Sequence, residues 1–310
     1  MATRALVVGG NGFIGSHLVE RLRADGYAPT VLDPGPPRAD LDWSDVRYVR
    51  APYTDATALD DALQSCDIVF HLASTTVPAS SNADPAFDVT SNLVGALGLI
   101  AAMRARGLRR IVFFSSGGTV YGGPEYLPMD EAHPLRPISS YGIVKVAIEH
   151  YLDMYRRSGE LDPLILRPSN PYGPRQSAAG GQGFIAAALA RAHADERLQI
   201  WGDGETVRDY IYIDDLIRLV IAAAASDACG AFNAGSGEGQ SLNAICAAVE
   251  RVAGRRLQTA HLPARGFDVR EVVLDTSAAR DRFAWAPRIG LDEGIARTWR
   301  WLDALSRSHT

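Results

Sequence analysis

The chain has 310 residues, of which 47% are hydrophobic and 22% are charged, and its formal net charge is −5. This composition is typical of a globular protein and excludes the disordered and fibrous classes. The negative charge provides no basic field for nucleic acid or for an anionic membrane surface, so we expect neither as a partner. The longest apolar stretch, residues 219–225, is far shorter than the ~20 residues that span a bilayer.

The first half of the chain alternates short apolar runs with helical patterns. The predicted strands cover residues 5–8, 29–33, 46–49, 68–72, 111–115 and 164–166, and the main predicted helices cover 16–25, 89–106 and 140–158. Strands that are continuously apolar and alternate with helices indicate a parallel sheet that is covered on both faces. We therefore predict an α/β fold of the doubly wound Rossmann type.

The second half begins with a segment of different composition. Residues 169–183 are rich in Gly, Pro, Ser and Asn, which is typical of a functional loop. Beyond this loop the pattern predicts helices at 183–194, 214–225, 242–252 and 291–304, and a strand at 231–234. We therefore predict two domains, of which the first comprises residues 1–168 with 209–235 returning to it. The second is a smaller C-terminal α/β part, formed by 169–208 and 236–310.

A glycine-rich turn follows the first predicted strand. The spacing of Gly9, Gly12 and Gly15 allows a tight turn, close approach of the backbone to a pyrophosphate, and close packing of a helix on the strand. The N–H groups at the start of the following helix would face the phosphates, and Phe13 and Ile14 in the turn are further candidate cofactor contacts. The sequence thus predicts a dinucleotide site in the first domain, against the alternative of a purely structural turn.

Acidic side chains and strand ends supply the other candidate cofactor contacts. Asp33 ends the second predicted strand, 18 residues after Gly15, where a carboxylate binds the adenosine ribose, although an Asp before a proline also starts turns. Its charge would repel a 2′-phosphate, which favours NAD over NADP. Asp55 is expected to meet the adenine amino group or, alternatively, to cap a helix. Five further candidates lie at strand ends and in one helix: Leu72, Ala73, Asn92, Ser115 and Pro168.

Tyr141 and Lys145 are the candidate catalytic pair. They are four residues apart in a predicted helix and lie on one face of it, with Cβ atoms about 5–6 Å apart. A free tyrosine has a pKa of ~10, and a nearby ammonium stabilises its phenolate. Behind a dinucleotide motif, this pair predicts redox chemistry on an alcohol carbon, with Tyr141 as acid/base and Lys145 as its partner and a ligand of the cofactor ribose. Taken alone, the same spacing also fits two amphipathic residues on a partly exposed helix.

Longer motifs resemble those of the extended short-chain dehydrogenase/reductases. The resemblance covers nearly the whole chain and lies in residues 9–17, 115–122, 167–176, 202–212 and 232–235. It is to the NAD-dependent nucleotide-sugar epimerases and dehydratases, most of all to the UDP-glucose 4-epimerases. In that family a tyrosine takes the proton of the hydroxyl on carbon 4 while the hydride passes to NAD, and both return to the other face of the ketone. The resemblance therefore implies an NAD-dependent isomerase acting on a nucleotide sugar.

The resemblance also implies substrate contacts. A nucleotide sugar carries a pyrophosphate, for which cationic side chains are expected. Asn170, Arg208 and Arg265 match the family's phosphate-binding residues. Three further candidates, for the phosphates, the base and the sugar respectively, are Arg175, Gln199 and Thr75.

One position departs from the family pattern. Gly117 stands where the family has a Ser or Thr that hydrogen-bonds the reacting hydroxyl, and glycine has no donor. We expect Ser116, Gly117 and Tyr141 to contact the sugar, with Ser116 as the nearest substitute helper. A bound water could fill this role instead, and the serines could merely satisfy backbone groups at the strand end. Dehydratases of the group carry an Asp-Glu pair where this chain has Gly118 and Thr119, which argues against dehydration.

Partners and location follow from the same patterns. The family often dimerises through two long helices, so we expect a homodimer. Apolar residues at helical spacing would fill that interface or pack inside the monomer: Leu93, Leu97, Ile100, Val144, Ile148 and Tyr151. The three cysteines show no metal-ligand or disulfide spacing and no signal segment precedes the first strand, so we expect no metal and a cytoplasmic protein. The alternatives are a dehydratase, decarboxylase or reductase of the same family, and a non-catalytic, redox-sensing NAD-binding protein.

Overall fold

The computed structural model describes residues 2–178, 183–264 and 269–307. The chain divides into two compact units. Unit 1 consists of Met1–Val120, Pro137–Arg167 and Val220–Phe232, and unit 2 of Tyr121–Arg136, Pro168–Leu219 and Asn233–Thr310. The prediction from sequence assigned residues 121–136 and 209–235 to the first domain, whereas in the structure 121–136, 209–219 and 233–235 cluster with unit 2.

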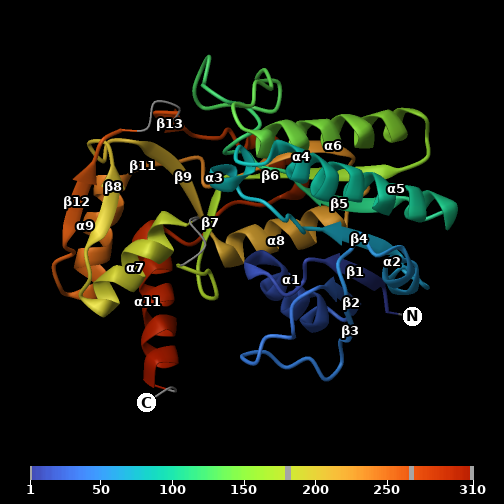
Figure 1. Ribbon diagram of the computed structural model, residues 1–310, viewed down its shortest axis with the longest axis horizontal. Coiled ribbons are helices and arrows are strands. Elements are labelled where there is room, and N and C mark those ends of the chain that lie inside the picture. Colours follow the sequence, from blue (N-terminus) through green and yellow to red (C-terminus); the bar gives the residue numbers. More distant parts are fainter. Residues whose placement is uncertain (1, 179–182, 265–268, 308–310) are drawn as a thin grey trace. The chain divides into compact units, whose positions relative to one another are not determined.

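A seven-stranded sheet forms the centre of unit 1 (Figure 1). Its strands, in the order β10-β6-β5-β4-β1-β2-β3, are Gly230–Ala234, Asp162–Pro168, Arg110–Phe114, Ile68–His71, Arg4–Val8, Ala28–Asp33 and Arg47–Arg50. The pairs from β6 to β3 are parallel. The inner strands β1, β4 and β5 are almost completely buried, because their apolar runs are covered on both faces. The predicted Rossmann fold is confirmed.

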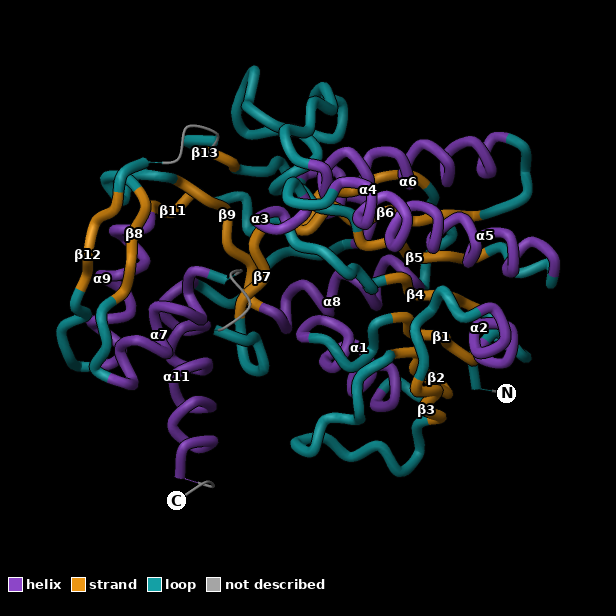
Figure 2. The backbone as a smooth tube through the Cα atoms, viewed as in Figure 1, coloured by secondary structure: helices purple, strands orange, loops and turns teal. Residues whose placement is uncertain are grey.

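The helices of unit 1 lie on both faces of this sheet, with α5 and α6 side by side on one of them (Figure 2). The helices are α1 (Phe13–Ala24), α2 (Ala56–Ala62), α3 (Pro78–Ser81), α4 (Pro85–Asp88), α5 (Gly95–Ala105) and α6 (Ser140–Arg157). One predicted boundary is wrong, since helix α1 begins at Phe13 rather than at residue 16. The predicted helix 89–106 starts with a π-helical turn, η1 (Val89–Val94), before α5. Such wide turns are frequent at functional sites.

The core of unit 1 on the α5–α6 face is built from the inner faces of these two helices. Ile100, Val144 and Ile148 are each 2% exposed and pack in this core. Most of the predicted apolar stripe therefore packs inside the monomer. The helical period shows that one face of each helix is apolar, but it does not show what covers that face. Of the described residues, the segment Pro85–Ala105 passes a length and hydropathy test for a membrane span, a test that core helices also pass.

Unit 2 contains two smaller sheets and a group of helices. Its strands are β7 (Asn170–Tyr172), β8 (Leu198–Trp201), β9 (Val207–Tyr212), β11 (Gly239–Ser241), β12 (Thr259–Leu262) and β13 (Glu271–Val272). Strand β9 pairs with β7, β11 and β13, and β8 pairs with β12. The helices are α7 (Phe184–Ala194), α9 (Leu242–Ala253), α10 (Ser277–Phe283) and α11 (Leu291–Arg307), while α8 (Ile213–Ala224) runs from unit 2 into unit 1.

Candidate active site

The turn between β1 and α1 is a glycine cradle. Gly9 has a φ of +84°, and a Cβ added to it would lie 2.9 Å from the backbone nitrogen of Ala73. A Cβ on Gly15 would collide with the carbonyl oxygen of Gly9, so helix and strand pack closely only with glycine here. Gly12, the N-cap of α1, supplies no side-chain acceptor to the first turn, which leaves N–H groups for an anion. The cradle therefore fits a dinucleotide pyrophosphate.

Asp33 contacts this cradle, and both acidic candidates make structural hydrogen bonds. The Asp33 carboxylate accepts hydrogen bonds from the backbone N–H groups of Asn11 at 3.2 Å and Gly35 at 2.9 Å, which ties the end of β2 to the glycine turn. Asp55 is the N-cap of α2, and its Oδ1 accepts from the N–H groups of Thr57 and Ala58. Its helix-cap alternative is therefore present in the structure, and the adenine contact stays a prediction.

The end of β4 lies beside the same turn. The backbone N–H groups of Leu72 and Ala73 both donate to the carbonyl oxygen of Val8 at 3.0 Å. Asn92 supports the next segment, since its Oδ1 accepts from the N–H of Thr75 at 2.9 Å. His71 is buried in β4, and burial together with the Lys145 charge lowers the pKa of His71 to about 3, so its ring is neutral.

Tyr141 and Lys145 lie on one face of α6, as predicted. The Lys145 Nζ is 5.5 Å from the centroid of the Tyr141 ring and donates to the carbonyl oxygen of Phe114 at 2.8 Å. Burial raises the pKa of Tyr141 to about 12, and the negative charge of Asp88 adds to this shift. Burial lowers the pKa of Lys145 to about 8, against the opposing effect of Glu149 and Asp88. Burial thus acts against the expected lowering of the Tyr141 pKa by Lys145 and the positive charge of oxidised nicotinamide, and that lowering stays a prediction.

The two serines after β5 differ in what they contact. Ser115 is buried and its hydroxyl donates to the Glu149 carboxylate, which forms a buried ion pair with Arg167 at 2.6 Å. Ser115 thus has a structural task, although its hydroxyl binds a carboxylate and not the backbone groups considered from sequence. Ser116 is partly buried, and its carbonyl oxygen shapes the turn by accepting the N–H of Val120 at 3.1 Å. Ser116 remains the candidate for a sugar contact beside Gly117.

The residues assigned to the substrate phosphates lie in unit 2. Asn170 begins β7 and its Nδ2 donates to the carbonyl oxygen of Asp209 at 2.9 Å, so β7 places it beside β9, which contains Arg208. Arg175 follows β7 in a left-handed conformation, with a φ of +69°. Gln199 is exposed on β8, in a separate sheet, so the structure does not bring it together with the β7–β9 residues within unit 2. Arg265 lies outside the described residues, and Pro168 ends β6.

Asp209 is a buried residue that the sequence analysis did not assign. It is fully buried, and its carboxylate accepts from the N–H and the hydroxyl of Ser236, both at 2.8 Å, and from the N–H of Gly237. Burial raises the pKa of Asp209, which these hydrogen bonds counteract. The contacts fix the strand that holds Arg208 to the turn before β11. The sequence signal that could have identified Asp209 is the position of an acidic residue directly after Arg208, the candidate phosphate ligand.

Sequence reasoning also missed the polar residues of the segment before η1. Ser81, Asn82 and Asp88 contact the start of α6, which begins one residue before Tyr141. The sequence analysis assigned no element between the strand 68–72 and the helix 89–106, because the run of small and polar residues there has no clear period. Asp84 before a proline, at the start of α4, was the available helix signal.

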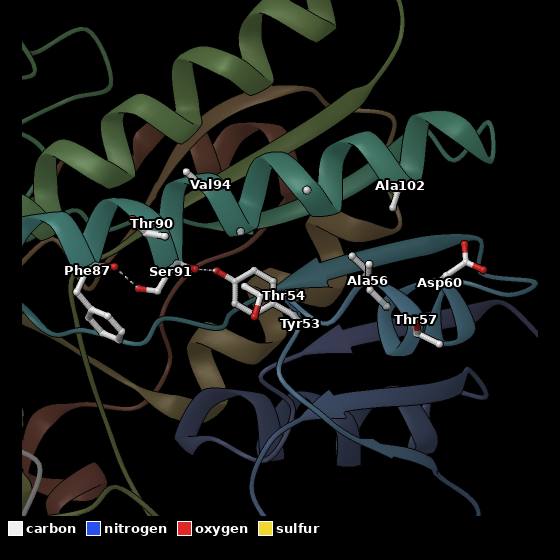
Figure 3. Close-up of a pocket in the computed structure, with 13 residues that line it drawn as sticks. Tyr53, Thr54, Ala56, Thr57, Asp60, Phe87, Thr90, Ser91, Val94 and Ala102 are labelled. Atoms are coloured by element: carbon white, nitrogen blue, oxygen red, sulfur yellow. Dashed lines mark hydrogen bonds between the residues drawn. The ribbon is translucent and has the colours of Figure 1, made fainter.

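A separate pocket of about 950 Å³ opens between α2 and the η1–α5 helix (Figure 3). Its lining includes Tyr53, Thr57, Phe87 and Val94, and it contains none of the residues assigned to cofactor or sugar. We assign no ligand to this pocket.

The Rossmann sheet, the glycine cradle after β1 and the Tyr141–Lys145 pair on α6 define a protein of the extended short-chain dehydrogenase/reductase class. Comparisons with known proteins support this class. The NAD dependent epimerase/dehydratase family model matches residues 5–235. A UDP-glucose 4-epimerase of Mycolicibacterium smegmatis is 38% identical over 304 residues, which cover 95% of this chain and 97% of the relative.

Solved structures give the same result. A UDP-glucose 4-epimerase of Thermotoga maritima, crystallised with UDP-glucose, has a TM-score of 0.94 and 33% identity, over 98% of this chain and 100% of the other. A UDP-glucose 4-epimerase of Thermus thermophilus, in complex with NAD, has a TM-score of 0.92 and 34% identity, over 97% and 99% of the two chains. The chain belongs to the NAD-dependent epimerase/dehydratase family. It is an NAD-dependent epimerase and therefore an isomerase.

Proposed function

We propose that this NAD-dependent nucleotide-sugar 4-epimerase interconverts UDP-glucose and UDP-galactose. The observation that carries the proposal is the position of Tyr141 and Lys145 on one face of α6, in the same unit as the glycine cradle. Relatives named UDP-glucose 4-epimerase, over nearly the full length of both chains, support the choice of sugar and base.

The residues of unit 1 account for the proton steps of such a reaction. Bound NAD supplies a hydride acceptor and donor for carbon 4 of the sugar and a positive charge near the phenol. Tyr141 takes the proton of the hydroxyl on carbon 4 as the C–H bond of that carbon breaks. After the ketone has presented its other face, Tyr141 returns the proton to the same oxygen. Lys145 stabilises the phenolate and is itself held by the Phe114 carbonyl. Lys145 is buried and Tyr141 is partly buried, which limits the access of water to the pair.

Unit 2 supplies the groups for the nucleotide. Arg208 and Asn170, which lie on paired strands, would bind the pyrophosphate, and Arg175 follows on the same loop. Arg265 and Gln199 complete the proposed set. We propose unit 1 as the NAD-binding part and unit 2 as the substrate-binding part.

A panel experiment tests the substrate. The purified protein is incubated with UDP-glucose, UDP-galactose and their N-acetylated forms, without added NAD, and the products are identified by mass spectrometry and NMR. We expect an isomer of equal mass for UDP-glucose and for UDP-galactose, with the same final ratio from either side. A product lighter by one water would contradict the epimerase assignment, and turnover of the N-acetylated sugars alone would contradict the proposed substrate.

Ser116 should assist the proton transfer. Ser116→Ala is expected to lower kcat by roughly 10-fold to 100-fold, because one hydrogen bond to a group that gains charge is lost. Ser116→Thr retains the hydroxyl and should keep kcat close to the parent value. Steady-state kinetics with UDP-galactose measures both. Equal kcat values for Ser116→Ala and the parent would assign the role to a bound water instead.

We propose a homodimer that forms through the outer faces of α5 and α6. Ile143 and Met154 on α6 are exposed at 55% and 47%, and Tyr151 lies on the same side of α6. Val94, the last residue of η1 directly before α5, is exposed at 54%. A variant with Ile143→Glu and Met154→Glu should therefore be monomeric, because two charges would be buried in the interface. Light scattering after size exclusion measures the mass, with Leu127→Glu, at another exposed apolar residue, as the control. A monomeric parent protein would rule the interface out. The cytoplasmic location stays a prediction.

A further inference from the structure

The proposed mechanism leaves one buried carboxylate of unit 1 without a task. Asp88 ends α4 and is 0% exposed. It accepts hydrogen bonds from Thr76 Oγ1 at 2.6 Å, Asn92 Nδ2 at 2.8 Å and Ser140 Oγ at 2.6 Å. All three donors are neutral, and removing a carboxylate from water costs several kcal/mol. A carboxylic acid in such a place therefore calls for an explanation.

On one side, the network of Asp88 holds the first turn of the catalytic helix. A helix leaves its first N–H groups without partners inside the helix. In α6, the N–H of Ser140 donates to Asn82 Oδ1 at 2.8 Å, and the N–H of Tyr141 donates to Ser81 Oγ at 3.1 Å. Together with the Ser140 hydroxyl on Asp88, the segment 81–88 fixes both the backbone and the direction of the turn from which Tyr141 projects.

On its other side, Asp88 contacts the segment that is expected to border the sugar. Its partner Asn92 accepts from the N–H of Thr75, and Thr76 donates directly to Asp88. The wide turn η1 contains Asn92 and is itself held by Tyr53, whose hydroxyl donates to the Ser91 carbonyl oxygen at 2.6 Å (Figure 3). Asp88 thus accepts hydrogen bonds both from the residue before Tyr141 and from the 75–76 segment.

We propose that Asp88 is a positioning residue for proton transfer: through Ser140 and Asn92 its carboxylate holds Tyr141 and the 75–76 segment in register for the same sugar hydroxyl. The proposal rests on the proposed function, since it takes Tyr141 as the acid/base. Misplacing a reacting group by about 1 Å costs on the order of 100-fold in rate, so a network of this kind has a kinetic effect that is larger than its effect on binding.

The charge of Asp88 gives the proposal a second observable. The titratable groups around Tyr141 are Lys145 and Glu149 on α6, Asp88 on α4 and the neutral His71 on β4. The negative charge of Asp88 raises the pKa of Tyr141 and also raises that of Lys145. Removing this charge lowers both pKa values. Both limbs of the pH–rate profile then move to lower pH, because the phenolate forms earlier and the ammonium is lost earlier.

Two variants separate position from charge. Asp88→Asn keeps the shape and removes the charge, whereas Ser140→Ala keeps the charge and removes the link to α6. We expect a fall in kcat of about 10-fold to 100-fold for both, with KM for UDP-galactose within roughly twofold. Only Asp88→Asn should shift the pH profile. Asp84→Asn is the matched control, since Asp84 caps the same helix, α4, and its carboxylate accepts the N–H of Phe87; its kcat should stay within about twofold.

Tyr141→Phe, measured in parallel, separates a failure of the positioning role from a failure of the proposed function. If Tyr141→Phe is inactive and Asp88→Asn keeps the parent kcat and pH profile, the positioning role is wrong and the proposed function stands. If Tyr141→Phe turns over normally, the proposed function itself fails. Thermal unfolding and the amount of bound NAD measure how much of the Asp88→Asn protein is folded. If kcat falls only in proportion to the folded protein, and the limbs of the pH–rate profile do not move, the positioning role is also wrong.

Discussion

Replacing Tyr141 by phenylalanine is expected to lower kcat by about 10²–10⁴-fold, because the variant loses the group that exchanges a proton with the sugar. KM should change little, since the ring and its packing remain. NAD should stay bound, because the glycine cradle is untouched. Steady-state kinetics with UDP-galactose and chromatography of the cofactor released on denaturation measure the three quantities.

Tyr151 provides a matched control on the same helix. It is an exposed tyrosine of α6, so Tyr151→Phe removes the same hydroxyl from a position that does not face Lys145. We expect parent activity for this variant. Similar kcat values for the two variants would mean that the phenol of Tyr141 takes no part in the chemistry.

Replacing Arg167 by methionine is expected to have the largest effect on stability. Arg167 and Glu149 form an ion pair in which each side chain is only 5% exposed, and Glu149 also accepts the Ser115 hydroxyl. Removing one partner of a buried pair costs about 3–5 kcal/mol, because the other charge stays in the interior without compensation. The thermal midpoint of the NAD-loaded protein should fall by on the order of 10 °C.

The comparison with an exposed pair isolates the effect of burial. Arg21 and Asp25 form an ion pair on α1 with 42% and 29% of their side chains exposed, so Arg21→Met should change stability by at most about 1 kcal/mol. A variant with both Arg167→Met and Glu149→Met should recover much of the loss, because no unpaired charge remains. Equal midpoints for Arg167→Met and Arg21→Met would show that the buried pair adds nothing specific to stability.

Several assignments from sequence depended on burial, which a sequence does not display. The spacing of Tyr141 and Lys145 indicated that an ammonium stabilises the phenolate, and the structure adds that burial raises the pKa of Tyr141 to about 12. Likewise, periodicity marked Ile100 and Ile148 as interface or core, and the structure makes them core, while Ile143 and Met154 face outward. In each case the local pattern is the same for both outcomes, and the neighbouring elements decide between them.

The sequence by itself determined the Rossmann fold, the glycine turn and the Tyr141–Lys145 pair. The turn and the pair are local spacings, and the fold follows from a succession of local strand and helix patterns. Only the tertiary structure decided which polar groups hold these parts together. Asp88 and Ser140 are 52 residues apart, and Arg167 and Glu149 lie on different elements. Such contacts form only when the sheet brings distant segments together, and no local period or spacing encodes them.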